Sequence, residues 1–161
     1  MPDAISNTSP LLYLHRAKSI DLLPHLFDEI WVPSAVILEL NEGRARGYDV
    51  PKPVELPWVR NVDPAATPSE WLSLDLGAGE LAAMALGLEN PTRVLLLDDL
   101  LARRTAQAAG LIVWGTLRIV LEAKSSGLIE QVRPVLSRLC DSGMWISDEL
   151  QQRIMRLAGE V

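Results

Sequence analysis

The sequence has only one cysteine, Cys140, among its 161 residues. A single cysteine excludes an internal disulfide bond and a zinc site built from several thiolates. Histidine is scarce as well: His15 and His25 have no clustered ligands nearby in the sequence, so we expect neither to bind a metal ion. No apolar run reaches the length that spans a bilayer, and the first residues lack the basic and apolar regions of a signal peptide. We therefore expect a cytoplasmic protein that does not enter a membrane.

The chain also has fewer basic than acidic residues. The chain has 15 lysines and arginines against 21 aspartates and glutamates, a net charge of -6, which argues against a protein that coats nucleic acid electrostatically. An enzyme acting on nucleic acid is still compatible, because a cation-binding site needs clustered carboxylates and these lower the net charge. The basic residues are nearly all arginines. Arginine suits bidentate phosphate contacts, although a solvated helix face explains most of them equally well.

Hydrophobic residues, by contrast, make up 48% of the chain, enough for a sizeable core. Short apolar segments alternate with segments of helical periodicity, and the runs at 93–97 (RVLLL) and 111–114 (LIVW) are typical of parallel strands buried on both faces. This alternation predicts an α/β fold, a three-layer α/β/α sandwich around a short central parallel sheet of four or five strands. We expect one domain over residues 1–161, with a C-terminal helical segment from about residue 130.

Several local signals mark helix starts and the core. Thr8 or Ser9 is expected to cap the helix that follows the first strand, and Ser34 the helix over AVILEL. The segment TPSE (67–70) fits a capping box that begins a short helix. We expect the five tryptophans to lie mostly in the core, with one at a subunit interface.

Five polar residues stand at positions that point to one site. Asn7 follows the first expected strand, and Asp98 and Asp99 follow the RVLLL strand. In an open parallel sheet, ligands bind beyond the carboxyl ends of the strands. Glu39 and Glu80 lie on helices among apolar residues, where a carboxylate is costly without a partner. We therefore expect these five side chains to meet in one cleft.

Converging carboxylates repel one another unless a cation holds them, and hard oxygen ligands favour Mg²⁺ or Mn²⁺. The chemistry that such a site performs is metal-assisted displacement at phosphorus. Taken singly, each carboxylate is explained as well by a helix cap or a solvated surface. The prediction therefore depends on their joint placement.

Three further residues are candidates for contacts with a substrate. The Ser9 hydroxyl could orient a water molecule at the metal site, while Arg103 and Arg104, directly after the acidic strand end, could hold a phosphate. A capping role explains Ser9 equally well, and a surface position or an ion pair explains the two arginines.

Five blocks of the sequence resemble the PIN-like proteins: ISNTSPLLYL, VPSAVILEL, LDLGAGELAAMALG, RVLLLDDLLAR and LIVWGTLRIVLEAKSSGLI. They are most similar to a prokaryotic PIN-like subgroup near the toxin components of VapBC-type toxin–antitoxin pairs. The resemblance runs from about Ile5 to Leu139, nearly the whole chain. It implies a cytoplasmic α/β/α endoribonuclease that uses Mg²⁺ or Mn²⁺ and acts on single-stranded or structured RNA. It also implies a small antitoxin protein as partner and a homodimer.

The same resemblance implies which residues line the cleft. Matched block by block, the family's acidic positions fall on Asn7, Glu39, Glu80, and Asp98 or Asp99. The four carboxylates are then the catalytic residues, and all five side chains hold the metal. Asn7 departs from the family's pattern. An amide oxygen still coordinates a hard cation, but it brings no negative charge and cannot act as a base.

Two other functions are compatible with the sequence. Because Asn7 is an amide, the protein could be a degenerate PIN-like module that binds RNA or a partner protein without cutting. Separately, GAGELA (77–82) fits a dinucleotide fingerprint, with LSLDL alternating like a preceding strand and Asp98 about twenty residues further on. Against this second alternative, Glu80 would lie at the helix N-terminus where the pyrophosphate must bind.

Overall fold

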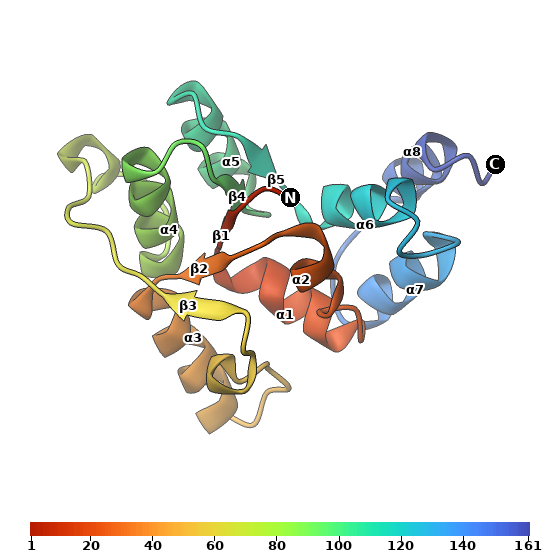
Figure 1. Cartoon of the computed structure of the whole chain (residues 1–161), viewed down its shortest axis with the longest axis horizontal. Coiled ribbons are helices and arrows are strands. Elements are labelled where there is room, and N and C mark those ends of the chain that lie inside the picture. The colour runs from red at the N-terminus through yellow and green to blue at the C-terminus, as the bar shows by residue number, and fades with distance from the viewer.

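The computed structural model describes all residues from 1 to 161 and has a central sheet of five parallel strands (Figure 1). The strands are β1 (Ala4–Ser6), β2 (Ile30–Val32), β3 (Val59–Asn61), β4 (Val94–Leu96) and β5 (Val113–Trp114). They lie in the order β3-β2-β1-β4-β5, and each neighbouring pair is parallel. β1 is therefore central, between β2 and β4.

Helices connect the strands and continue beyond the last one. The α-helices are α1 (Thr8–Arg16), α2 (Leu22–Leu26), α3 (Ser34–Ala45), α4 (Ala78–Glu89), α5 (Leu100–Ala108), α6 (Thr116–Ser125), α7 (Arg133–Asp141) and α8 (Asp148–Leu157). Two short 3-10 segments are η1 (Pro53–Glu55) and η2 (Ser69–Trp71). No helix combines the length and the apolar character needed to cross a membrane.

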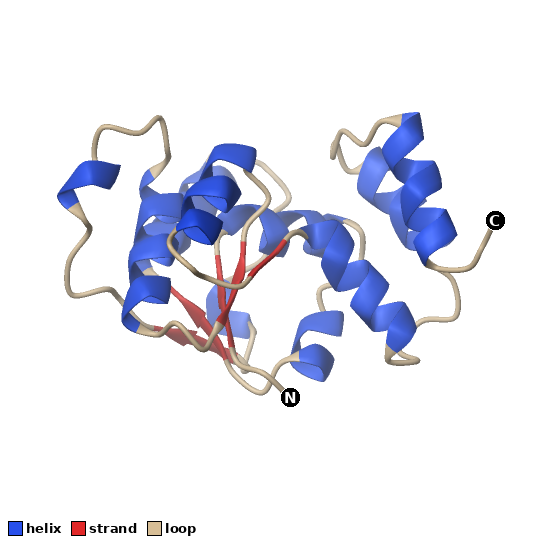
Figure 2. Cartoon of the chain, turned by 90° about the horizontal axis from the view of Figure 1, so that it is seen from above, coloured by secondary structure: helices blue, strands red, loops and turns tan.

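The central strands bury alternate side chains on the two faces of the sheet. Ala4, Val94 and Leu96 belong to a hydrophobic cluster with residues of α1, α2, α3 and α6. Ile5 and Leu95 belong to a second cluster, with residues of α4 and α5. Figure 2 shows the strands enclosed by helices on both sides. This arrangement confirms the predicted three-layer α/β/α sandwich. Burial on both faces explains why β4 is a continuous apolar run, whereas the edge strand β3 (VRN) is largely exposed.

The last two helices extend the molecule on one side. Residues of α7 and α8 form a third hydrophobic cluster with Ala17, which follows α1, and with Val120 of α6. In Figure 1 these two helices lie beyond α1 and α6, away from the sheet. The chain is thus helical at its C-terminal end, and this part rests on α1 and α6 rather than on the strands.

The strand order reverses between β1 and β4. The chain runs from β1 outward to β2 and β3, then returns to β4 and continues to β5. In doubly wound parallel sheets, the connections diverge at such a point and leave a crevice at the carboxyl ends of the strands. Asn7 directly follows β1, and Asp98 and Asp99 lie just past β4. The topology therefore carries both predicted strand-end sites to the same crevice.

Some local predictions are wrong. The Ser34 side chain does not cap α3; the Asp63 carboxylate does so by accepting the Ser34 N–H at 2.7 Å and the Ser34 hydroxyl at 2.6 Å. These two bonds hold the pKa of Asp63 below its ordinary value. TPSE gives only the 3-10 segment η2, without a side-chain cap. LSLDL (72–76) forms turns, so the strand that a dinucleotide fingerprint needs before its glycines is missing.

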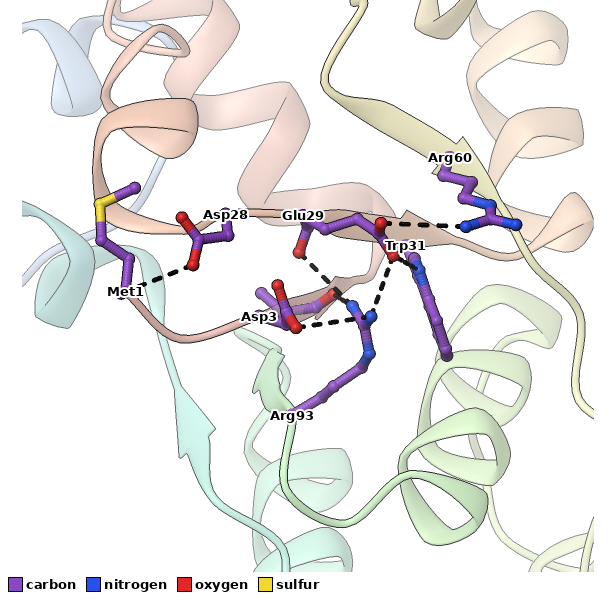
Figure 3. Close-up of polar contacts among 8 residues, drawn as sticks. Met1, Asp3, Asp28, Glu29, Trp31, Arg60 and Arg93 are labelled. Carbon is purple, nitrogen blue, oxygen red and sulfur yellow. Dashed lines mark hydrogen bonds and ion pairs between the residues drawn. The ribbon is translucent and has the colours of Figure 1, made fainter.

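Arg93 lies at the amino ends of the strands, on the side of the sheet opposite the crevice (Figure 3). Its guanidinium donates to the Ala4 carbonyl at 3.2 Å and to the Glu29 carboxylate at 3.0 Å, and it lies 3.3 Å above the centre of the Trp31 ring. The Trp31 indole N–H also donates to the Glu29 carboxylate, and this bond together with Arg93 lowers the pKa of Glu29. One side chain thus ties together the starts of β1, β2 and β4.

Replacing Arg93 by lysine tests this stabilising role. Arg93→Lys keeps the charge but loses the flat stacking on Trp31 and the planar array of donors, so we expect the free energy of unfolding to fall by about 1–2 kcal/mol. Urea unfolding measures the change. Arg60→Lys is the matched control, because Arg60 is 68% exposed and only approaches Glu29 at 3.8 Å. The control should stay within about 0.5 kcal/mol of the wild type, and equal losses would contradict the assignment.

Candidate metal centre

A pocket of about 400 Å³ opens at the carboxyl edge of the sheet, beside the ends of β1 and β4. The residues that line it are Asn7, Thr8, Ser9, Tyr13, Glu39, Glu80, Asp98 and Asp99. Four of these eight side chains are carboxylates, and none is a lysine, an arginine or a histidine. The structure therefore brings all five predicted metal-binding residues to one pocket.

Asn7 is held at the pocket by the end of β1. It occupies the N-cap position of α1 in an extended conformation, where an asparagine ordinarily accepts an N–H of the first helical turn. Its side chain makes no such bond, and Oδ1 is buried without any hydrogen-bond partner although the residue is only 3% exposed. Since a buried polar atom without a partner is unfavourable, this oxygen is available to a ligand in the pocket.

Glu39 reaches the pocket from the middle of α3. Its carboxylate accepts the Gly79 N–H at 2.7 Å and the Thr8 hydroxyl at 2.9 Å. Thr8 therefore orients Glu39 rather than capping α1, in contrast to its predicted role. The approach to α4 is close: a Cβ atom on Gly79 would lie 2.3 Å from Glu39 Oε1 and 3.1 Å from Asn7 Oδ1. Only glycine at position 79 leaves room for Glu39 and Asn7 to converge there.

Glu80 lies in the first turn of α4, and its Oε1 accepts the Gly77 N–H at 3.0 Å. Burial raises the pKa of Glu80, and the negative charges of Asp99 and Glu39 raise it further, while the bond from Gly77 opposes the rise. Glu80, Asp99 and Glu39 therefore lie close enough for their charges to influence one another.

Asp98 and Asp99 follow β4 but bind different partners. Asp98 accepts the Thr116 N–H at 2.7 Å and the Thr116 hydroxyl at 2.6 Å, whereas Asp99 accepts the Ala102 N–H at 2.8 Å and so caps α5. Burial raises the pKa of Asp98, opposed by the two bonds from Thr116 and by the nearby Arg103. Of the two aspartates, Asp98 is the more buried and Asp99 the more exposed.

Each carboxylate is thus bonded to an N–H at the start of a helix. Helix N-termini carry partial positive charge, which offsets part of the repulsion among the four acids. In this arrangement no three acidic, histidine or cysteine side chains form a ready-made metal cluster. The donor set nevertheless fits a hard divalent cation: it is all oxygen, no basic side chain competes, and the Asn7 oxygen is unpartnered.

Comparison with known families identifies the fold. The family model described as a PIN domain (DUF3368) matches residues 3–160. The chain belongs to the PIN domain family. PIN domains are typically nucleases that bind nucleic acids and generally use divalent metal ions. The family match confirms the PIN-like resemblance seen in the sequence. No curated protein and no solved structure shows significant similarity to the chain.

The three candidate substrate contacts of this PIN domain lie in different places. Ser9 lines the acidic pocket. Arg103 lines a neighbouring cleft that shares Asp98 with the pocket. Arg104 is exposed and lies elsewhere, beside Trp71 on the outer side of α5. The structure therefore leaves Arg104 outside the acidic pocket.

Sequence reasoning missed several residues that shape the site. Thr116 is the main partner of Asp98, and Tyr13 lines the pocket. A signal for Thr116 was present, because it follows the LIVW strand and must lie at the same carboxyl edge. Gly79 belonged to a motif that suggested a phosphate-binding turn, whereas its lack of a side chain serves the approach of Glu39. Nothing in the sequence indicated Tyr13.

Proposed function

We propose that this PIN domain is a divalent-metal-dependent endoribonuclease. The observation that carries the proposal is the make-up of one pocket: four carboxylates and the unpartnered amide oxygen of Asn7, without a basic side chain. Such a group of acids repels itself unless a cation joins it, and hard oxygen donors select Mg²⁺ or Mn²⁺. The usual nuclease activity of PIN domains supports the same function.

Helix capping alone accounts for part of this arrangement. Asp98, Asp99 and Glu80 each accept N–H groups at the start of a helix, which is a stabilising role in itself. Glu39 takes part in the same way, because it accepts the Gly79 N–H in the first turn of α4. Capping does not account for Asn7, whose Oδ1 is buried without a partner at a position where asparagine normally caps. This residue favours a ligand-binding role.

In the proposed site, Asn7, Glu39, Glu80, Asp98 and Asp99 hold one or two Mg²⁺ or Mn²⁺ ions. The metal supplies charge stabilisation at the phosphate and a more acidic water. The protein's own contribution is orientation: Thr8 and Gly79 fix the Glu39 carboxylate from two directions, and Thr116 fixes that of Asp98. The Ser9 hydroxyl also lines the pocket and would orient a water molecule there.

The biological setting of this activity is also a proposal. The similarity to the subgroup near VapBC-type toxins supports a role as the toxin of a toxin–antitoxin pair in the cytoplasm, with a small antitoxin protein as partner and a homodimer as the active form. We further propose that residues 1–161 act as a single domain, since the family match extends to residue 160 and α7 and α8 pack onto α1 and α6.

One observation favours a second function, RNA or protein binding without cleavage. Asn7 removes a negative charge from the position where the family has an acid, and no three acidic side chains form a ready-made metal cluster. Weaker metal affinity is the expected consequence. Such a degenerate module would keep the fold and the pocket but would not cut RNA.

Cleavage of a mixed-sequence single-stranded RNA in the presence of Mn²⁺ tests the proposal. We expect cleavage by the wild type and none by Asp98→Asn/Asp99→Asn, which removes two charges from the pocket. Asn7→Asp adds a charge there and should increase cleavage at limiting Mn²⁺. Asp141→Asn, an exposed change at the end of α7, is the control and should cut like the wild type.

The alternatives predict different outcomes. An inactive wild type with an active Asn7→Asp variant would mean that activity was lost at residue 7, and the binding function would replace the nuclease function. Cleavage that persists in the double variant would contradict the proposed site. If none of the proteins cuts or binds the RNA, the assignment to RNA is wrong.

A further inference from the structure

A second cleft, of about 480 Å³, adjoins the acidic pocket. It lies between α6 and α8, and Asp98 lines both cavities. Its other lining residues are Arg103, Gly115, Leu117, Arg118, Leu121, Met144, Trp145, Leu150, Arg153, Ile154 and Leu157. The cleft and the acidic pocket therefore border the same residue, so a chain-like ligand at the pocket has this cleft next to it.

The charge of this cleft is opposite to that of the pocket. Three arginines line it, against the single carboxylate of Asp98, whereas the acidic pocket has no basic residue. Arg118 is engaged by Glu122 at 3.3 Å, but Arg103 and Arg153 form no ion pair. The Nε of Arg103 is buried without a partner beside Asp98. In a chain of net charge -6, two unpaired arginines next to a metal-binding pocket suit a phosphodiester backbone.

The outer end of the cleft carries an exposed aromatic ring. Trp145 lies in the loop between α7 and α8 and is 84% exposed, whereas none of the other four tryptophans is exposed. Leu150 and Leu157 of α8 are exposed beside it. Exposed aromatic rings next to arginines are the usual means by which proteins hold single-stranded nucleic acid, because every base presents a face on which a ring stacks.

We propose that this cleft holds the single-stranded RNA segment that adjoins the phosphate bound at the acidic pocket. Arg103 and Arg153 contact its phosphates, and Trp145 stacks on a base. The inference rests on the proposed ribonuclease function and adds a binding site for the flanking nucleotides. A protein segment is the competing occupant, but the two unpaired arginines and the position of the cleft next to the acidic pocket favour a polyanion.

Fluorescence anisotropy with a labelled single-stranded RNA in EDTA, where no cleavage occurs, tests the inference. We expect Trp145→Ala and Trp145→Leu to weaken binding at least about fivefold, and Trp145→Phe to stay close to the wild type because it retains a stacking ring. Arg153→Ala should reduce the slope of log Kd against log salt by about 0.7. Arg156→Ala, the same change on α8 outside the cleft, is the matched control and should leave binding unchanged.

Each result decides the question. Losses in the Trp145 and Arg153 variants, with Arg156→Ala unaffected, support the inference. If the wild type cuts RNA but the cleft variants bind it normally, the inference is wrong while the nuclease function stands. If the wild type neither binds nor cuts RNA, both fail together. Normal RNA binding with an altered oligomeric state of Trp145→Ala, measured by light scattering, would assign the cleft to a second copy of the chain and overturn the inference.

Discussion

Gly79→Ala is expected to lower RNA cleavage about 100-fold while the protein stays folded, because misplacing a catalytic group by about 1 Å has effects of that size. A Cβ atom at position 79 would lie 2.3 Å from Glu39 Oε1 and 2.9 Å from Glu39 Cδ. No real Cβ contact is that short, so something must move. The group that moves most easily is the carboxylate of Glu39, since it lies at the end of a flexible side chain.

The stability of Gly79→Ala should change far less than its activity. Alanine is favoured over glycine in a helix by about 1 kcal/mol, and residue 79 lies in α4 with a negative φ. The displaced Glu39 loses its bond from the Gly79 N–H, which offsets part of this gain. We therefore expect a melting temperature close to that of the wild type, measured by circular dichroism alongside cleavage.

Gly87→Ala is the matched control for this variant. It makes the same substitution in the same helix, but the nearest atoms to its Cβ would be methyl groups of Leu111 and Leu95, at 3.2 and 3.6 Å, and neither residue lines the pocket. Cleavage by Gly87→Ala should equal that of the wild type. Normal cleavage by Gly79→Ala, or equal losses in both variants, would show that Glu39 does not act from the position that the structure gives it.

Much of the fold was predictable because the central strands are buried on both faces. The run RVLLL contains β4 and its neighbours, as expected for a strand covered by helices on both sides. LIVW contains β5, but β5 is an edge strand and Ile112 is 51% exposed. The joint placement of Asn7 and Asp98 was predictable for a related reason. Residues that follow neighbouring parallel strands meet at the same edge of the sheet, and the reversal of strand order places that edge between β1 and β4.

The details of the site depend on contacts between distant segments, which periodicity does not encode. Thr8 fits a helix cap in its local sequence, yet its hydroxyl donates to Glu39, thirty-one residues away. Similarly, the side chain that caps α3 is not Ser34 but Asp63, which follows β3. Trp145 fits a core position by composition, but the loop between α7 and α8 exposes it. In each case a tertiary contact, or its absence, overrides a sound local preference.

Glu80→Gln is expected to raise the melting temperature at pH 7 in EDTA by about 1–3 °C. Burial and the charges of Asp99 and Glu39 raise the pKa of Glu80 above its ordinary value, so the folded protein binds this proton more tightly than the unfolded chain. Stability from this group is therefore complete below the unfolded pKa and is lost as the pH rises through the folded pKa. Glutamine never ionises, and its advantage should disappear near pH 4.

Adding Mn²⁺ at pH 7 should raise the melting temperature of the wild type above that of Glu80→Gln. An ion at about 100 times its Kd stabilises the wild type by about 2.7 kcal/mol, which raises the melting temperature of a chain of this size by about 5–10 °C. Glu80→Gln has lost one charged ligand, so its melting temperature should rise less on adding Mn²⁺. Glu70→Gln, an exposed change outside the pocket, should follow the wild type in both conditions. Equal gains for Glu80→Gln and the wild type would remove Glu80 from the metal site. A change of order between EDTA and Mn²⁺ would mean that the four acids destabilise the metal-free fold, and that the cation they bind compensates for their repulsion.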